Sequence, residues 1–328
     1  MNTSTITTRD GRPSFPRTLA LVALLVAAPA FAAPFAWITS QGSNDVSVVD
    51  IAAAKVVATV PVGRAPAGVA VSDAAGKTFV ANAEGHSVSV LSLATRQVVN
   101  QLPVPGGPLG IAASPDGTRV YVASMFGRRL VAIDAASERV LGDLGVGRMP
   151  AGLVVSPDGR TVYLAERDDD CIAVIDAASL TVRARIPVGQ HPFALGLTPD
   201  GRTLLALNVE SDDVSVVDVA ASRVTATVAV GHAPYGVVLS DDGRRAWVTN
   251  QHAGSVSLLA LEGTPRVLAT FAEAAEYPEG LALAGDRLLV VSWMNDEALL
   301  LDAASGAPIA RVPLGRNPRG FGQVLGTR

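Results

Sequence analysis

Residues 151–192 read AGLVVSPDGRTVYLAERDDDCIAVIDAASLTVRARIPVGQHP. Similar copies lie on either side: residues 109–150 read LGIAASPDGTRVYVASMFGRRLVAIDAASERVLGDLGVGRMP, and residues 193–234 read FALGLTPDGRTLLALNVESDDVSVVDVAASRVTATVAVGHAP. The unit occurs seven times at a spacing of 42 residues, so that Arg64 and Arg316 occupy equivalent positions 252 residues, or six units, apart. Self-similarity at such a period is typical of repeat folds and decides the architecture before any single motif does.

Each copy contains four short runs rich in Val, Ile, Leu and Tyr, which is typical of β-strands. In residues 151–192 these runs are GLVVS, TVYLAE, CIAVID and VRARIPV. They are separated by the turn sequence SPDG, a polar loop, the turn DAAS and a G-x-x-P loop. Four antiparallel strands in a unit of about forty residues indicate one blade of a β-propeller.

The two ends of the repeat series predict how the ring closes. The first unit begins at its second strand, AWITS at residues 36–40, and the chain ends with RGFGQVL at residues 319–325, which matches a first strand. We therefore predict an all-β, seven-bladed β-propeller with four antiparallel strands per blade. The ring closes by pairing the C-terminal strand with the N-terminal three, because closure removes an exposed sheet edge.

The N-terminus has the pattern of a cleaved export signal. Three arginines precede an apolar run at residues 19–28, and the sequence Ala-Phe-Ala at residues 30–32 fits a cleavage site. The run is too short for a confident membrane span. We predict a signal peptide at residues 1–32, a single propeller domain at residues 33–328, a periplasmic location, and no membrane span after cleavage.

Charge and cysteine content narrow the function. The formal net charge is −4, and removing the leader with its three Arg and one Asp leaves about −6. This acidity argues against a general binder of nucleic acid or anionic membranes. The single cysteine, Cys171, excludes an internal disulfide and a cysteine-based metal cluster, and its place at the start of an apolar run predicts a buried thiol.

Three strings that follow the first turn of their units, YVASMFG, YLAERDD and WVTNQHAG, resemble the YVTN-type β-propeller repeat family. The resemblance extends over residues 36–325 and implies a seven-bladed propeller. The family includes YncE-like periplasmic proteins, one type of which is linked to DNA binding. Related propellers include lactonases and the heavy chain of quinoprotein amine dehydrogenase, so the resemblance implies the fold and leaves several functions open.

In such a propeller, the loops before each first strand and the loops after each second strand share one face, at the mouth of the central channel. Arginines recur there, and a ring of arginines on an acidic protein would suit a carboxylate, a phosphate or a quinone acid. The alternative is that these arginines are solvated or paired with nearby glutamates. The predicted ligand-binding residues of the mouth are Arg64, Arg148, His191, His232, Tyr235, Glu276, Trp293, Arg316 and Arg319.

Other side chains of this face allow further chemistry. Three histidines and a glutamate could bind zinc or iron, but no short His spacing supports a metal site, and we predict neither a metal nor a cofactor. The acidic run at residues 166–170 lacks the order of a calcium loop, which favours a solvated turn. Phe193 and Tyr235 could stack on a planar ligand, or pack between blades.

The sequence contains no nucleophile motif, phosphate-binding Gly loop or haem attachment motif. We therefore predict a binding or scaffold module whose partner is a small anionic ligand or a periplasmic protein, and we expect a monomer. An enzyme or enzyme subunit is the first alternative, either a lactonase-like hydrolase or a propeller associated with a quinoprotein dehydrogenase. Nucleic-acid binding is the second alternative. The sequence assigns no catalytic residue.

Overall fold

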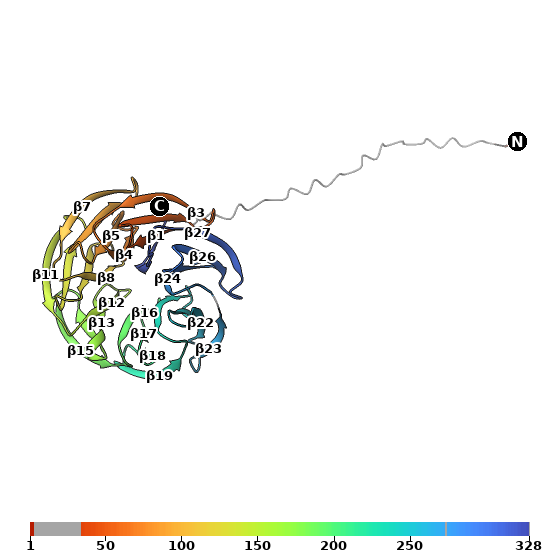
Figure 1. The fold of residues 1–328 in the computed structure, drawn as a ribbon. Coiled ribbons are helices and arrows are strands. Elements are labelled where there is room, and N and C mark those ends of the chain that lie inside the picture. The colour runs from red at the N-terminus through yellow and green to blue at the C-terminus, as the bar shows by residue number, and fades with distance from the viewer. Residues whose placement is uncertain (3–33, 273, 328) are drawn as a thin grey trace. The chain divides into compact units, whose positions relative to one another are not determined.

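The computed structural model describes residues 1–2, 34–272 and 274–327, and the described residues contain no α-helix. Their strands form seven sheets arranged as a ring around a central channel (Figure 1). The predicted seven-bladed propeller is therefore confirmed. The predicted signal peptide lies, except for its first two residues, outside the described part of the chain. No helix among the described residues is long and apolar enough to cross a membrane.

The blades follow one another along the chain. Blade 1 joins β1 (Phe35–Ser40), β2 (Asp45–Asp50) and β3 (Lys55–Pro61) to β29 (Leu325–Gly326). Blade 2 has β4 (Pro66–Ser72), β5 (Lys77–Asn82), β6 (Ser87–Ser92) and β7 (Gln97–Pro103), with β28 (Phe321–Gln323) on its inner edge. Blade 3 has β8 (Pro108–Ala113), β9 (Arg119–Ser124), β10 (Arg129–Asp134) and β11 (Arg139–Gly145).

The remaining blades repeat this order from the centre outward. Blade 4 has β12 (Pro150–Val155), β13 (Thr161–Glu166), the short 3₁₀ turn η1 (Arg167–Asp169), β14 (Cys171–Asp176) and β15 (Thr181–Pro187). Blade 5 has β16 (Pro192–Leu197), β17 (Thr203–Asn208), β18 (Asp213–Asp218) and β19 (Arg223–Ala229). Blade 6 has β20 (Pro234–Leu239), β21 (Arg245–Asn250), β22 (Ser255–Ala260) and β23 (Arg266–Phe271), and blade 7 has β24 (Pro278–Ala284), β25 (Arg287–Ser292), β26 (Glu297–Asp302) and β27 (Pro308–Pro313).

The hydrophobic core lies between blades. Tyr121 and Leu130 of blade 3, for example, pack in one cluster with Leu164 and Ile175 of blade 4. The first three strands of each blade are mostly buried, whereas most residues of the outer strands are exposed or half-buried. A single blade therefore cannot bury its own faces, and the ring follows from stacking neighbours until it closes.

The inner strands of neighbouring blades approach so closely that they require glycine. Five first strands carry glycine at the third position, just after the Pro-x pair, and the ladder to the second strand breaks there as a bulge. A Cβ atom at Gly110 would collide with the backbone carbonyl oxygen of Ala151 in the next blade. The other four glycines meet a backbone carbonyl oxygen in the same way: Gly68, Gly152, Gly236 and Gly280. This contact draws the hub of the propeller together.

The C-terminal segment closes the ring, as predicted, but it also makes a detour. Pro318 bridges to Ser40, and β29 pairs antiparallel with β1. Between these points β28 leaves β1 and pairs in parallel with β4, so that blade 2 gains a fifth strand. Gly322 permits this path with a φ of 109°. The repeat pattern of the sequence did not predict the detour, and its result is that Phe321 and Gln323 line the central channel.

A buried polar residue ends each of the seven second strands. In blade 6, the amide of Asn250 donates to the hydroxyls of Ser255 at 3.0 Å and Ser257 at 2.9 Å. Its oxygen accepts from the N–H of Gly231 at 3.1 Å, which fixes the loop that leads into the inner strand. In blade 4 the equivalent residue is Glu166, which is fully buried. The acidic run is therefore structural at Glu166 and not a solvated turn as the sequence favoured.

Cys171 is buried, as predicted, with its Sγ 3.3 Å from Oε2 of Glu166. Burial, together with the hydrogen bond and charge of Glu166, raises the pKa of the thiol to about 12. Since the thiolate is the reactive form, we expect no reaction with Ellman's reagent in the folded protein at pH 8. One equivalent should react after unfolding in guanidinium, and fast labelling of the native protein would contradict this prediction.

Candidate functional site

Two sets of loops form one face of the ring, called here the mouth face: the loops that enter each first strand and the loops that follow each second strand. These loops are held to each other by Asx side chains. The N–H of Ala65 donates to Oδ1 of Asn44 at 2.8 Å, and the N–H of Ala233 donates to Oδ1 of Asp212 at 2.8 Å. The residue before the proline has a positive φ in both cases. The short G-x-x-P loop therefore adopts a fixed shape and presents its second residue outward.

The predicted arginines lie in these loops, and each of them has a partner. Arg64 forms an ion pair with Glu84 at 2.9 Å, and Arg148 forms one with Asp169 at 2.6 Å. Arg316 donates to a backbone carbonyl of the β1–β2 loop at 2.9 Å. No described contact joins the three arginines to one another. Each of these arginines therefore pairs with a group in its own blade or in a neighbouring blade. Anion binding by the three arginines stays a prediction.

A row of histidine and aromatic side chains crosses blades 5 to 7 of the mouth face. Nδ1 of His232 lies 2.9 Å from Oδ1 of Asp212, and its ring centroid lies 4.9 Å from that of His252. The next centroids follow at 5.4 Å to Tyr277 and 5.5 Å to Trp293. The row brings two predicted site residues, His232 and Trp293, to either end of one continuous surface. The indole N–H of Trp293 is buried and has no hydrogen-bond partner among the described residues.

The residue after each repeat proline forms a ring at the hub, one from each blade. Its members, called here the hub ring, are Ala67, Leu109, Ala151, Phe193, Tyr235, Glu279 and Arg319. Phe193 stacks on Tyr235 with centroids 4.2 Å apart and packs against Phe321 at 5.1 Å. Phe321 also belongs to one hydrophobic cluster with the small members of the ring. The aromatic rings therefore close the channel near the mouth face, as expected for packing between blades.

The polar members of the hub ring form a partly buried network. Arg319 donates to the hydroxyl of Tyr235 at 3.1 Å and to Oε1 of Gln41 at 2.9 Å. Its Nη1 lies 3.6 Å from Oε2 of Glu279, whose side chain is only 2% exposed. Oε1 of Glu279 accepts from Gln251 at 3.1 Å, but Oε2 has no hydrogen-bond partner among the described residues. The network therefore contains a carboxylate whose hydrogen bonding is incomplete.

Burial dominates the electrostatics of this network. It raises the pKa of Glu279 to about 7, although the charge of Arg319 acts in the opposite direction. Burial also raises the pKa of the Tyr235 hydroxyl above its ordinary range, and the charge of Glu279 adds to this effect. Glu279 is thus a carboxyl group of the mouth face whose protonation changes near neutral pH. The structure places this group next to two predicted residues, Tyr235 and Arg319.

The other predicted residues lie apart from this network. Nδ1 of His191 lies 2.7 Å from Oε1 of Glu210, and its other neighbour is Arg167. Glu276 is exposed, and its backbone oxygen accepts from the hydroxyl of Ser292. No group of three or more His, Cys, Asp and Glu side chains in the described ranges is placed to hold a metal ion. The site prediction missed Glu279 and Phe321 as members. Glu279 had a signal, because the residue after the repeat proline is uncharged in five other units.

The fold and the mouth face define a seven-bladed propeller closed by its C-terminal strand, with a plugged hub and a polar, aromatic face. The YncE-like β-propeller family model matches residues 76–159 and 153–324, which together exceed half of the chain. The chain belongs to this YncE-like β-propeller family. No protein of curated function matches the chain in sequence.

Solved structures share the fold at low sequence identity. Hydrazine synthase of Kuenenia stuttgartiensis is similar with a TM-score of 0.71 and 23% identity, covering 77% of this chain and 87% of that one. A functionally unknown protein from Desulfotomaculum acetoxidans DSM 771 has a TM-score of 0.77 and 14% identity, covering 86% and 97%. Dihydro-heme d1 dehydrogenase NirN, in complex with DHE, has a TM-score of 0.66 and 17% identity, covering 90% and 77%. At these identities the likeness shows the fold alone.

Proposed function

We propose that the chain is an exported periplasmic scaffold, cleaved after residue 32, whose mouth face docks a partner protein. The observation that carries this proposal is the pair of large apolar side chains exposed on the mouth face. Phe126 is 71% exposed and Met294 is 53% exposed, in loops of blades 3 and 7. Aromatic residues, methionine and arginine are enriched at the centres of protein interfaces, and exposed apolar side chains on fixed loops suit docking.

The charges of the mouth face support a macromolecular partner over a small anion. Arg64 and Arg148 already pair with carboxylates, and the aromatic stack closes the hub. Among the described residues Arg64, Arg148 and Arg316 each have a partner, so a small anion would find no convergent free guanidinium groups there. A partner protein, in contrast, could contact many separate side chains of the mouth face, which are arginines on some blades and acidic residues on others. Charge complementarity of this kind gives orientation and association rate more than affinity.

Site-specific photocrosslinking in cells that produce the protein tests this proposal. A photoreactive residue at position 126 or 294 should capture the same discrete partner. The same residue at position 141 or 268, which are exposed on outer strands, should not capture it. The double change Phe126→Asp and Met294→Asp should abolish capture from a third mouth position, residue 64. Equal capture at the outer positions, or none at the mouth, would contradict docking at this face.

Binding experiments with the purified protein distinguish the other predicted functions from partner docking. A small anionic ligand should be retained by the protein and lost on combining Arg64→Ala, Arg148→Ala and Arg316→Ala. Nucleic-acid binding should appear as a mobility shift that weakens steeply with salt. Retention of an anion without any crosslinked partner would favour the small-ligand form of the binding function.

A further inference from the structure

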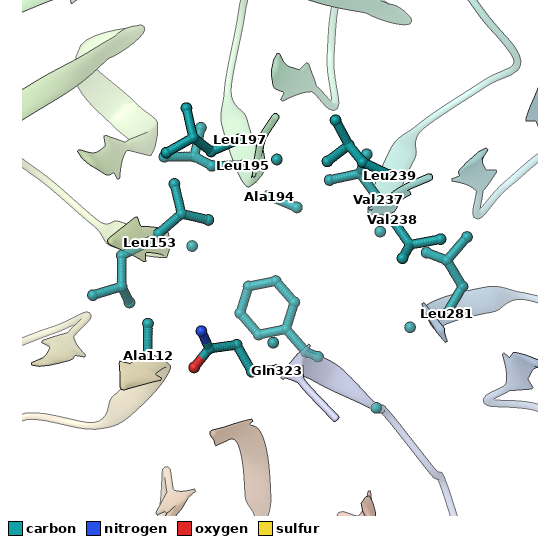
Figure 2. Close-up of a pocket in the computed structure, with 18 of the residues that line it drawn as sticks. Ala112, Leu153, Ala194, Leu195, Leu197, Val237, Val238, Leu239, Leu281 and Gln323 are labelled. Atoms are coloured by element: carbon teal, nitrogen blue, oxygen red, sulfur yellow. The ribbon is translucent and has the colours of Figure 1, made fainter. Parts of the chain in front are cut away.

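The central channel contains a cavity on the far side of the aromatic closure. Its volume is about 220 Å³, and most of its lining comes from the inner strands of blades 4 to 7 (Figure 2). Leu153, Leu195 and Leu239 surround it, and Leu281 completes the wall. Phe321 lies between the cavity and the aromatic stack, since it contacts Phe193 and also lines the cavity. The cavity is thus a cup with one closed end.

The cup opens on the face opposite the mouth. Each inner strand runs from its proline at the mouth face to the turn that follows its last residue. The lining residues nearest that turn, Leu197 and Leu239, are partly exposed, whereas Ala194 and Leu195 near the mouth are buried. A ligand therefore reaches the cup from the side of the Ser-Pro-Asp-Gly turns, and a ligand or partner on the mouth face does not compete with it.

The chemistry of the wall excludes a charged ligand. None of the residues that line the cup carries a charge, and Gln323 supplies the one polar side chain. That amide is already used, because its Oε1 accepts from the N–H of Ala113 at 2.8 Å. The buried side-chain atoms that lack a hydrogen-bond partner in the described residues all lie outside the lining. Burying a charge here would therefore go uncompensated.

The wall does offer backbone groups. The inner strands β12, β16 and β20 are each the last strand of their sheet, so one edge of each has no strand partner among the described residues. The equivalent edge of β4 is occupied within the same channel by β28. Such edges supply N–H and C=O groups to one uncharged polar group of a ligand.

We propose that this cup is a second binding site, for a small uncharged molecule with an apolar ring or fused-ring body and at most one hydrogen-bonding group. A dry cavity of about 150 Å³ accommodates benzene, so 220 Å³ fits a body of about ten non-hydrogen atoms. Leucines at an open rim gain on average about 25 cal/mol for each Å² that a ligand removes from water. If the cavity served only the stability of the fold, large apolar side chains such as Leu197 and Leu239 would not be needed at its solvent-facing rim.

Isothermal titration with indole tests the proposal, with indole-3-carboxylate as the charged counterpart. Indole should bind the purified propeller in a saturable one-to-one manner, and the carboxylate should bind at least about tenfold more weakly. At about ten times its Kd, indole should also raise the Tm by about 2 °C. Absence of saturable binding, or equal binding of the carboxylate, would overturn the proposal.

A matched pair of variants locates the site. Leu197→Trp fills part of the cup and should weaken indole binding at least tenfold, whereas Leu141→Trp makes the same change on an exposed outer strand and should leave it unaltered. Unaltered binding by Leu197→Trp contradicts the site. If circular dichroism shows that this variant does not fold, a crystal of the wild-type protein under xenon decides. Xenon should occupy the cup, and an empty cup would overturn the proposal.

Discussion

Replacing Gly110 by alanine should destabilise the folded protein by about 2–3 kcal/mol, because one methyl group at the hub collides with the backbone of the next blade. The added Cβ would overlap the carbonyl oxygen of Ala151 and lie 3.0 Å from Cδ2 of Leu153. A backbone atom cannot rotate away as a side chain can. Relief of the clash therefore requires the inner strands of blades 3 and 4 to separate, which loosens a closed ring on both sides.

The control is Gly145→Ala in the outer strand of blade 3. A Cβ there meets nothing within 4 Å, and alanine is favoured over glycine in a strand by roughly 0.5–1 kcal/mol. This variant should be as stable as the parent protein or slightly more stable. Urea denaturation followed by circular dichroism measures both. Equal stability of the two variants would show that the hub strands can move apart at little cost.

The propeller was predictable from the sequence because it follows from the repeat. A unit of four strands cannot bury both faces of its own sheet, so neighbouring units must stack. One unit is divided between the N-terminal and C-terminal segments, and pairing these two segments satisfies the free strand edges of both. The prolines and the third-position glycines mark where each inner strand starts and where the hub tightens. These features depend on local sequence and on a period, and both can be read without coordinates.

The contents of the mouth face were predictable, but its contacts were not. The loops in which Arg64 and His232 lie could be assigned to one face from the sequence. The partner of each side chain could not, because it depends on the direction in which side chains of neighbouring loops point. The row from His232 to Trp293, together with Asp212, joins three blades and has no counterpart in the linear spacing. Phe321 closes the hub because Gly322 lets the chain turn toward β4, a path that a pattern of strand-like residues does not reveal.

Raising the pH from about 4.5 to about 7 should reduce the stability of the folded protein by up to about 3 kcal/mol through Glu279 alone. Burial raises its pKa from 4.5 to about 7. Between these values the folded state holds a proton that the unfolded state has released, so the contribution is complete below pH 4.5 and falls as the pH rises toward 7. Above pH 7 both states are ionised and the loss levels off.

The substitution Glu279→Gln should remove this pH dependence, since the amide keeps the shape of the protonated carboxyl. The variant should match the parent protein near pH 4.5 and exceed its stability at pH 8. Glu84→Gln is the matched control, because Glu84 is 63% exposed in its pair with Arg64 and should leave the profile unchanged.

The carboxylates of the strand turns do not obscure the pH range in which Glu279 acts. Hydrogen bonds from Ser179 lower the pKa of Asp176 to about 2, and similar bonds lower the pKa of Asp134 and Asp302. Their contributions are lost at more acid pH. Urea denaturation between pH 4.5 and 8 therefore isolates Glu279 when the parent and the Gln variant are compared. Parallel profiles for the two proteins would mean that water reaches Oε2 of Glu279, and the hub would then be open to the mouth face.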